Sequence, residues 1–285
     1  MTRIAYVNGA YLPEDQAKVS IFDRGYVFAD GVYEVAAVLD GRLVDSARHQ
    51  WRLENSLRAL NIPMPLPWPE IEAMERELVR QNNIDQGMVY FQVTRGVADR
   101  EFWYEPDMPP TLTAFTQAKQ LDPSPMAQRG VCVVTCPDLR WARRDIKSIA
   151  LLGQVMAKQI AHEADAFEAL MVEDGLITEG SSASAFIINH DNQLIVRPGQ
   201  GTDILPGLTR MAMLDLAKEN GIEIVERPFS VAEFYAAKEA FLTAATIFVM
   251  PIVRGDGRQI GEGKPGEITL KLRQLFIDMA RATST

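Results

Sequence analysis

The chain has 285 residues, and its composition is 47% hydrophobic, 24% charged and 8% aromatic. These proportions are close to the average for globular proteins, which excludes a disordered chain, a collagen and a disulfide-stabilised miniprotein. The formal net charge of −9 argues against a general binder of the nucleic-acid backbone, so we expect no nucleic-acid partner.

The first part of the chain opens with a hairpin and continues with strands and two helices. Residues 4–7 and 11–12 flank the pair Asn8-Gly9, which is typical of a tight β-turn. We expect one helix after Ser46 and another over residues 70–81, with four prolines between them. The remaining expected elements are strands, over residues 33–39, 42–44, 88–94 and 111–117.

Residues 119–128 contain two prolines and no apolar periodicity, and we interpret them as a linker. They would join a small N-terminal α/β domain, 1–118, to a larger C-terminal domain, 129–285. Strands and helices mix without regular βαβ alternation, which predicts a two-lobed α+β fold. In the larger domain we expect strands over 130–135, 168–172, 176–179, 184–188, 194–197 and 240–243. We expect its helices over 149–163, from 208 to the Asn220-Gly221 pair, over 231–237 and over 268–281.

The two cysteines, Cys132 and Cys136, lie in one predicted strand. Their Cα atoms would be about 13 Å apart there, too far for a disulfide, so we interpret both as buried small apolar residues. The N-terminus lacks the apolar core of a signal peptide, and no run of ~18 apolar residues occurs. These features predict a cytoplasmic protein with no membrane partner.

The sequence lacks the motifs of several large enzyme classes. It contains no CxxC and no HExxH, and His162 and His190 fall at a helix end and in a turn, so we expect no metal site. It also contains no GxSxG, no GxxxxGK[ST] and no GxGxxG after a predicted strand. Hydrolase, P-loop NTPase and Rossmann dehydrogenase functions are therefore disfavoured.

Three polar segments remain that are suited to chemistry. Lys147 lies between a predicted strand and an apolar helix, where burial lowers the pKa of a lysine and frees its amine for a Schiff base. Glu179 lies between two apolar strands, where it would be a buried acid. The helix that begins near Leu208 would offer free N–H groups to an anion. Each segment alone has an ordinary alternative: a surface lysine, a hairpin of small residues, or a helix end that binds nothing.

Together the three segments resemble those of the fold-type IV pyridoxal-phosphate enzymes, also called class IV aminotransferases. Within that family the chain looks most like the D-amino-acid transaminases. The resemblance extends from residues 6–9 to residues 261–266, and it implies that family's two-lobed α+β fold with pyridoxal phosphate bound by the large C-terminal domain. The matching residues are 20–35, Arg140-Trp141, 145–148 with Leu151-Leu152, and 178–182.

The resemblance implies roles for residues that bind pyridoxal 5′-phosphate. Lys147 would hold the cofactor as a Schiff base and move the proton between the substrate's Cα and the cofactor. Glu179 would pair with the pyridine nitrogen and keep it protonated.

The phosphate of the cofactor would bind the N–H groups of Leu208 and Thr209 and the side chain of Arg52. A further threonine contact of the family falls at Ala245 by simple register, and we favour the neighbouring Thr246 for it.

Substrate recognition departs from the family pattern, in which a tyrosine and an Arg-x-His pair hold the α-carboxylate. Tyr33 and Arg100 match, but Phe102 replaces the histidine. Arg24 or a group of a partner subunit could replace the lost donor. The apolar ring predicts weaker carboxylate binding together with turnover of (R)-configured arylalkylamines. Ser182 is the remaining expected substrate contact.

We therefore expect a ping-pong transaminase that exchanges the amino group between D-amino acids, such as D-alanine, and 2-oxo acids, namely 2-oxoglutarate and pyruvate. The alternatives are 4-amino-4-deoxychorismate lyase and an (R)-selective amine transaminase. Arg100 and the segment at residues 31–34 disfavour the lyase. An inactive homologue that only binds ligands is disfavoured by the intact Lys147, Glu179 and Arg52. The resemblance also implies a homodimer in which residues 95–104 reach the partner's site.

Overall fold

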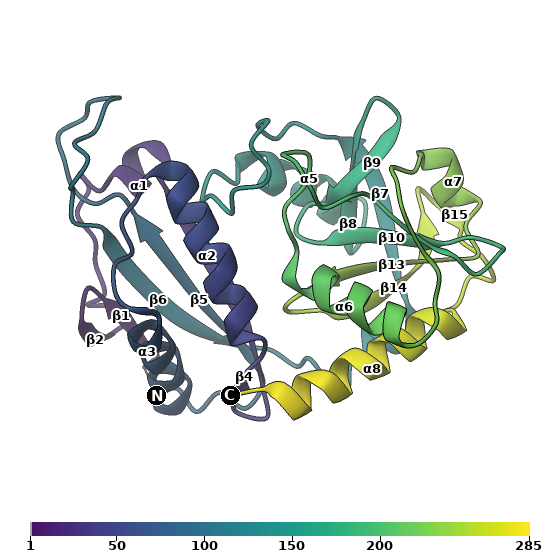
Figure 1. The fold of residues 1–285 in the computed structure, drawn as a ribbon, viewed down its shortest axis with the longest axis horizontal. Coiled ribbons are helices and arrows are strands. Elements are labelled where there is room, and N and C mark those ends of the chain that lie inside the picture. Colours follow the sequence, from purple (N-terminus) through teal and green to yellow (C-terminus); the bar gives the residue numbers. More distant parts are fainter. Residues whose placement is uncertain (1) are drawn as a thin grey trace. The chain divides into compact units, whose positions relative to one another are not determined.

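The computed structural model describes residues 2–285 and divides them into two compact units (Figure 1). The first unit comprises the residues up to Leu121 with Ile146–Ala150 and Ala280–Thr285, and the second comprises Asp122–Asp145 and Leu151–Met279.

The segment around Lys147 therefore differs from the sequence-based division, since it belongs to the first unit. The backbone explains why. Tyr33 N–H donates to the Lys147 carbonyl at 3.0 Å, and Ile149 N–H donates to the Gly31 carbonyl at 3.1 Å. The segment thus runs alongside a strand of the first unit.

The sheet of the first unit is antiparallel and runs in the order β2-β1-β6-β5-β3-β4. The expected hairpin joins its first two strands, and both turn residues have positive φ, 45° at Asn8 and 97° at Gly9, as such a turn requires. The strands are β1 (Ile4–Val7), β2 (Ala10–Pro13), β3 (Gly31–Leu39), β4 (Arg42–Leu43), β5 (Gly87–Thr94) and β6 (Thr111–Ala118).

Two helices, α2 (Ser46–Leu60) and α3 (Trp68–Gln81), pack against this sheet. Side chains alternate along β3, so Val32 and Ala36 join the buried cluster that also contains residues of both helices. Tyr33 points to the opposite face, where its ring stacks on Tyr90 at 5.5 Å. This alternation decides which residues of β3 face α2.

A short helix that the sequence analysis missed, α1 (Arg24–Phe28), precedes β3. The Asp23 carboxylate caps it by accepting from Gly25 N–H at 2.8 Å, and its other oxygen accepts from the Thr94 hydroxyl at 2.9 Å. Asp23 therefore fixes α1 to the end of β5.

The sheet of the second unit mixes parallel and antiparallel pairs in the order β12-β11-β10-β13-β14-β7-β8-β9, and β15 pairs with β14. The parallel pairs are β11 with β12, β14 with β7 and β7 with β8. The strands are β7 (Val131–Pro137), β8 (Glu168–Glu173), β9 (Leu176–Gly180), β10 (Ser184–Ile188), β11 (Leu194–Val196), β12 (Ile224–Glu226), β13 (Glu239–Ala244), β14 (Phe248–Gly255) and β15 (Arg258–Gln259).

Side chains cap some of the helices in the rest of the chain, while others begin without a side-chain cap. The Glu239 carboxylate, at the start of β13, accepts from the N–H groups of Ile268 and Thr269 and so caps the last helix from a distant strand. The helices are α4 (Pro125–Arg129), α5 (Leu152–Glu163), α6 (Leu208–Glu219), α7 (Val231–Tyr235) and α8 (Glu267–Thr283). Within residues 2–285 the structure holds no helix that is both long and apolar enough to span a membrane.

Two sequence-based expectations are wrong. β14 was not expected, because Pro251 lies within it and proline is rare inside a central strand. Cys132 is exposed and only Cys136 is buried: the two lie four residues apart on the same face of β7, and Cys136 alone packs in a cluster with Ala157 and Ala161 of α5. Residues 125–129, at the end of the segment interpreted as a linker, form α4, which Ser124 caps through its hydroxyl.

Candidate active site

Lys147 lies on the Tyr33 face of β3. Its backbone N–H donates to the Ser56 hydroxyl at 3.2 Å, and its carbonyl accepts from Tyr33 N–H. The half-buried side chain places Nζ 4.1 Å from the centroid of the Tyr33 ring. The structure thus brings together two of the predicted site residues, an amine and a tyrosine.

Arg52 lies on the other face of β3, in a buried charge cluster with Glu34 and His49. The Arg52 guanidinium donates to both Glu34 carboxylate oxygens, at 2.8 and 2.7 Å, and His49 Nδ1 lies 2.7 Å from Glu34 Oε2. Burial opposes ionisation of Glu34, but Arg52 and His49 outweigh it and hold the pKa of that carboxyl well below its usual range. Arg52 is therefore fixed in place by a carboxylate that the sequence analysis did not single out.

One signal in the sequence marks Glu34. It occupies an inward-facing position of β3, between Val32 and Ala36, where a fully buried acid needs a cationic partner. An acid at an apolar position of an alternating strand therefore indicates a buried partner, here from the helix that packs on that face.

Glu34→Gln is expected to lower the free energy of unfolding by about 3–5 kcal/mol, because it leaves the buried Arg52 guanidinium without its counter-charge. Urea unfolding of the variant and the parent at pH 7 measures this loss. Glu77→Gln, which removes an exposed ion pair with Arg80, is the matched control and should cost less than about 1 kcal/mol. Equal stability of Glu34→Gln and the parent would contradict the role given to this cluster.

Arg100 and Phe102 lie on an exposed loop between β5 and β6. The Arg100 guanidinium carbon is 5.3 Å from the Phe28 ring centroid and 5.4 Å from that of Phe102, and the two rings are 5.4 Å apart. The Phe102 side chain is 78% exposed. Arg24 is no substitute for the missing histidine, since it is buried and its guanidinium donates to Asp30 and to backbone carbonyls.

Glu179 lies in the second unit, on β9, in a buried polar network. Its Oε2 accepts from the Arg140 guanidinium at 2.5 Å and from Leu205 N–H at 3.2 Å. Burial raises the pKa of the Glu179 carboxyl, and Arg140 opposes that rise. Arg140 also donates to Asp138 at 2.7 Å, so it remains anchored whether or not Glu179 is charged. Arg140 matched the family pattern, but its partner was not foreseen.

Ser182 follows β9 and is exposed, yet its hydroxyl donates to a buried acid. Ser182 Oγ lies 3.0 Å from Glu168 Oε2, and the hydroxyl of Ser181 donates to the other oxygen of Glu168. Glu168 therefore orients the hydroxyl of Ser182. The sequence analysis missed Glu168 because it stands on β8, thirteen residues or more from either serine.

The start of α6 fits an anion. Its N-cap residue, Gly207, offers no side chain, and the first helical bond runs from Met211 N–H to the Gly207 carbonyl. The N–H groups of Leu208 and Thr209 lie ahead of that bond and are directed out of the helix end. Thr246 lies in the turn between β13 and β14, half-buried, and its predicted phosphate contact stays a prediction.

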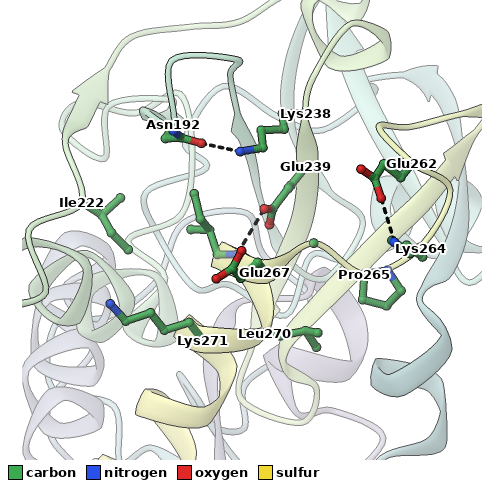
Figure 2. Close-up of a pocket in the computed structure, with 12 residues that line it drawn as sticks. Asn192, Ile222, Lys238, Glu239, Glu262, Lys264, Pro265, Glu267, Leu270 and Lys271 are labelled. Carbon is green, nitrogen blue, oxygen red and sulfur yellow. Dashed lines mark hydrogen bonds and ion pairs between the residues drawn. The ribbon is translucent and has the colours of Figure 1, made fainter.

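The second unit also contains a cavity of 850 Å³ whose lining does not include Glu179 or the start of α6, and Figure 2 shows the residues that line it. Lys238 reaches the Asn192 side chain at 2.5 Å, and Lys264 pairs with Glu262 at 2.8 Å. None of the predicted site residues lines it.

The predicted residues suit a phosphorylated pyridine cofactor in chemical terms. Both hydrogen bonds described for Glu179 reach Oε2, so Oε1 is available to accept from a pyridinium N–H. The uncapped start of α6 suits a phosphate. Lys147 supplies an amine beside a tyrosine ring. Three separate chemical demands of pyridoxal phosphate are therefore met by residues of this chain.

Comparison with known proteins agrees with this chemistry. The chain is 40% identical over 262 residues to a D-alanine aminotransferase of Bacillus licheniformis, covering 92% of each chain. Its fold matches the branched-chain amino acid aminotransferase of Escherichia coli, with a TM-score of 0.90 at 22% identity over 98% of this chain and 95% of that one.

A second solved structure, the PLP-bound form of a hypothetical aminotransferase from Mycobacterium tuberculosis, matches with a TM-score of 0.84 at 20% identity, covering 98% of this chain and 99% of that one. At these identities the two structures show the fold alone. The model of the family described as amino-transferase class IV matches residues 31–254. That match extends from β3 to β14, and the chain belongs to the class IV aminotransferase family.

Proposed function

We propose that the chain is a pyridoxal-phosphate-dependent transaminase that exchanges the amino group between D-amino acids and 2-oxo acids. The observation that carries the proposal is Lys147, whose amine lies over the Tyr33 ring in a chain 40% identical to a D-alanine aminotransferase. When bound, pyridoxal phosphate accepts the amino group and the negative charge that develops at the substrate's Cα.

Separate residues of this chain would bind the different parts of the cofactor and transfer the proton. Lys147 Nζ would bind the cofactor and then move a proton to and from the substrate's Cα. Glu179 Oε1 would accept from the pyridine N–H, with Arg140 keeping the carboxylate in place. The N–H groups at the start of α6 and the guanidinium of Arg52 would bind the phosphate, with Thr246 as a further contact.

Arg100 and Tyr33 would bind the α-carboxylate of the substrate, and Ser182 would contact the substrate through the hydroxyl that Glu168 orients. The exposure of Arg100 on the surface of its own chain supports a homodimer in which the loop serves the partner's site.

Exposed apolar side chains support the same assembly. Residues before and within α1, residues of the loop and residues of α5 leave large apolar groups in water, which is typical of an interface. They include Ile21 (68%), Tyr26 (75%), Phe102 (78%), Trp103 (62%), Leu152 (73%) and Val155 (60%). A second copy of this chain is the proposed occupant. The cytoplasmic location expected from the sequence stays a prediction.

A second activity, on (R)-configured primary amines, is favoured by Phe102. An apolar ring beside Arg100 gives no hydrogen bond to a carboxylate and penalises a substrate without one less than a histidine would. We therefore expect D-alanine and (R)-1-phenylethylamine both to serve as amino donors.

Arg100→Ala is expected to lower kcat/KM for D-alanine by about 10- to 150-fold while changing that for (R)-1-phenylethylamine little, because only D-alanine has a carboxylate to lose. Steady-state rates with pyruvate or 2-oxoglutarate as acceptor give kcat/KM for both amino donors. Arg58→Ala, which removes an exposed arginine of α2, is the control. Equal losses on both donors would mean that Arg100 supports the structure and does not bind the carboxylate.

A half-reaction tests the proposed function. The holoenzyme, mixed with D-alanine and no acceptor, is expected to release one pyruvate per active site and to lose the visible absorbance of its cofactor. L-alanine should do neither at a comparable rate. Continuous pyruvate release from aminodeoxychorismate, without an amino acceptor, would instead identify a lyase.

A further inference from the structure

The loop that carries Arg100 is mostly exposed and has few bonds of its own. We define it as residues 97–109, between the end of β5 and the start of β6. Glu101 N–H donates to the Asp99 carbonyl at 2.8 Å, and Ala98 N–H donates to the Phe22 carbonyl at 3.3 Å. Residues 99–107 are exposed, and Met108 is buried near the loop's end. The conformation of its tip must depend on contacts from outside the loop.

Arg24 supplies those contacts. Its Nη1 donates to the carbonyls of Glu101 at 2.6 Å and Trp103 at 3.3 Å, and Nη2 lies 3.5 Å from that of Phe102. Guanidinium donors have a fixed planar arrangement, so one arginine can set the relative positions of consecutive carbonyls. These carbonyls belong to the three residues that follow Arg100, so their positions restrain the backbone from which the Arg100 side chain extends.

Arg24 is itself rigidly held. It is 4% exposed, its Nε donates to Asp30 at 2.9 Å, and its backbone N–H donates to the Gly96 carbonyl at 2.8 Å. Asp30 also binds Arg95, whose guanidinium carbon lies 3.5 Å from the centroid of the Tyr104 ring. Asp30 therefore anchors two arginines, and each of them contacts the loop.

The Arg100 guanidinium rests on rings that Arg24 helps to place. Arg24 lies 4.8 Å from the Phe28 ring centroid, and Arg100 lies 5.3 Å from the same centroid. Phe102, whose carbonyl faces Arg24, supplies the second ring. Cation–π contacts at these distances restrain a charged side chain that would otherwise sample many rotamers.

We propose that Arg24 is a positioning residue. It binds the backbone carbonyls of residues 101–103 and so keeps the Arg100 guanidinium against the rings of Phe28 and Phe102, where it can bind a carboxylate. The carboxylate part of this inference rests on the proposed function. The part that concerns the loop's conformation does not.

Proteolysis of the holoenzyme tests the conformational part. Trypsin cleaves after Arg100, and a rigid loop resists it. Arg24→Met keeps an apolar side chain against Phe28 and leaves Asp30 paired with Arg95, but it removes every donor to the loop. We expect Arg24→Met to be cleaved after Arg100 faster than the parent by about tenfold or more. The masses of the two fragments identify this cleavage. Arg24→Lys should give an intermediate rate, and Arg80→Met, at an exposed site, should match the parent.

A double-mutant cycle tests the link to Arg100. Arg24→Met is expected to lower kcat/KM for D-alanine by on the order of 10- to 100-fold, mostly through KM, because Arg100 is misplaced. In an Arg100→Ala background the same change should cost little more, since Arg24 then has nothing to position. A merely structural effect would instead be the same in both backgrounds.

The outcomes separate cleanly. Faster cleavage with a non-additive cycle supports the inference, while unchanged cleavage or an additive cycle overturns it. If the parent does not transaminate D-alanine, the proposed function fails, and the cleavage rates alone then decide whether Arg24 holds the loop.

Discussion

Lys147→Ala is expected to lose transamination of D-alanine by several orders of magnitude while keeping its fold. The reason is that Lys147 supplies both the amine that binds the cofactor and the group that moves the proton, and neighbouring residues of its segment have no amine to replace it. Removing a group that acts in both steps loses two contributions to transition-state stabilisation. Each ~1.4 kcal/mol lost slows the reaction tenfold, so together they slow it by several orders of magnitude. Initial rates with D-alanine and 2-oxoglutarate measure the loss.

The matched control is Lys264→Ala, which removes an exposed lysine paired with Glu262. It should retain the parent's rate. Circular dichroism of both variants checks that the fold is kept. Turnover of D-alanine by Lys147→Ala at near the parent's rate would refute the assignment.

Glu179→Gln is expected to slow amino transfer from D-alanine by on the order of 100-fold or more, corresponding to a few kcal/mol of lost electrostatic stabilisation. A neutral amide does not stabilise a protonated pyridine nitrogen as a carboxylate does. The fold should persist, because Arg140 keeps its bonds to Asp138. Stopped-flow measurement of the half-reaction resolves this step from product release.

The Glu179 prediction also has a pH dependence. Burial raises the pKa of Glu179, so acidification protonates it earlier than an exposed glutamate. In the protein without cofactor, binding of pyridoxal phosphate should therefore weaken as the pH falls toward that raised pKa, and binding to Glu179→Gln should lack this pH dependence. Glu173→Gln, which changes an acid that pairs with Arg144 at the surface, is the control. An unchanged half-reaction rate in Glu179→Gln would eliminate the proposed role.

The sequence singled out candidate site residues in short polar segments, and the resemblance to the class IV aminotransferases implied their roles. Lys147 and Glu179 are examples, since each is a charged residue flanked by apolar strands or helices. Most helices were also placed within a few residues, because their apolar periodicity and caps are local. Two elements show the limit of such local patterns. A short irregular segment precedes the start of α5 at Leu152, and a proline lies inside the strand β14.

The pairing of the site residues with their partners could not be predicted, because the two members of each pair come from distant parts of the chain. Glu34 on β3 binds Arg52 on α2, Arg140 binds Glu179 across 39 positions, and Arg24 reaches the carbonyl of Glu101 across 77. Strand register and helix placement create these contacts, and no spacing in the sequence encodes them. The structure thus added the partners of the predicted site residues, and the roles of those residues stay predictions.

Chiral analysis of the products that the purified holoenzyme forms from D-alanine and 2-oxoglutarate tests the proposed transamination of D-amino acids. A D-amino-acid transaminase should form D-glutamate and pyruvate in equal amounts, with no glutamate formed when L-alanine replaces D-alanine. Formation of L-glutamate, or of pyruvate without glutamate, would contradict a D-amino-acid transaminase.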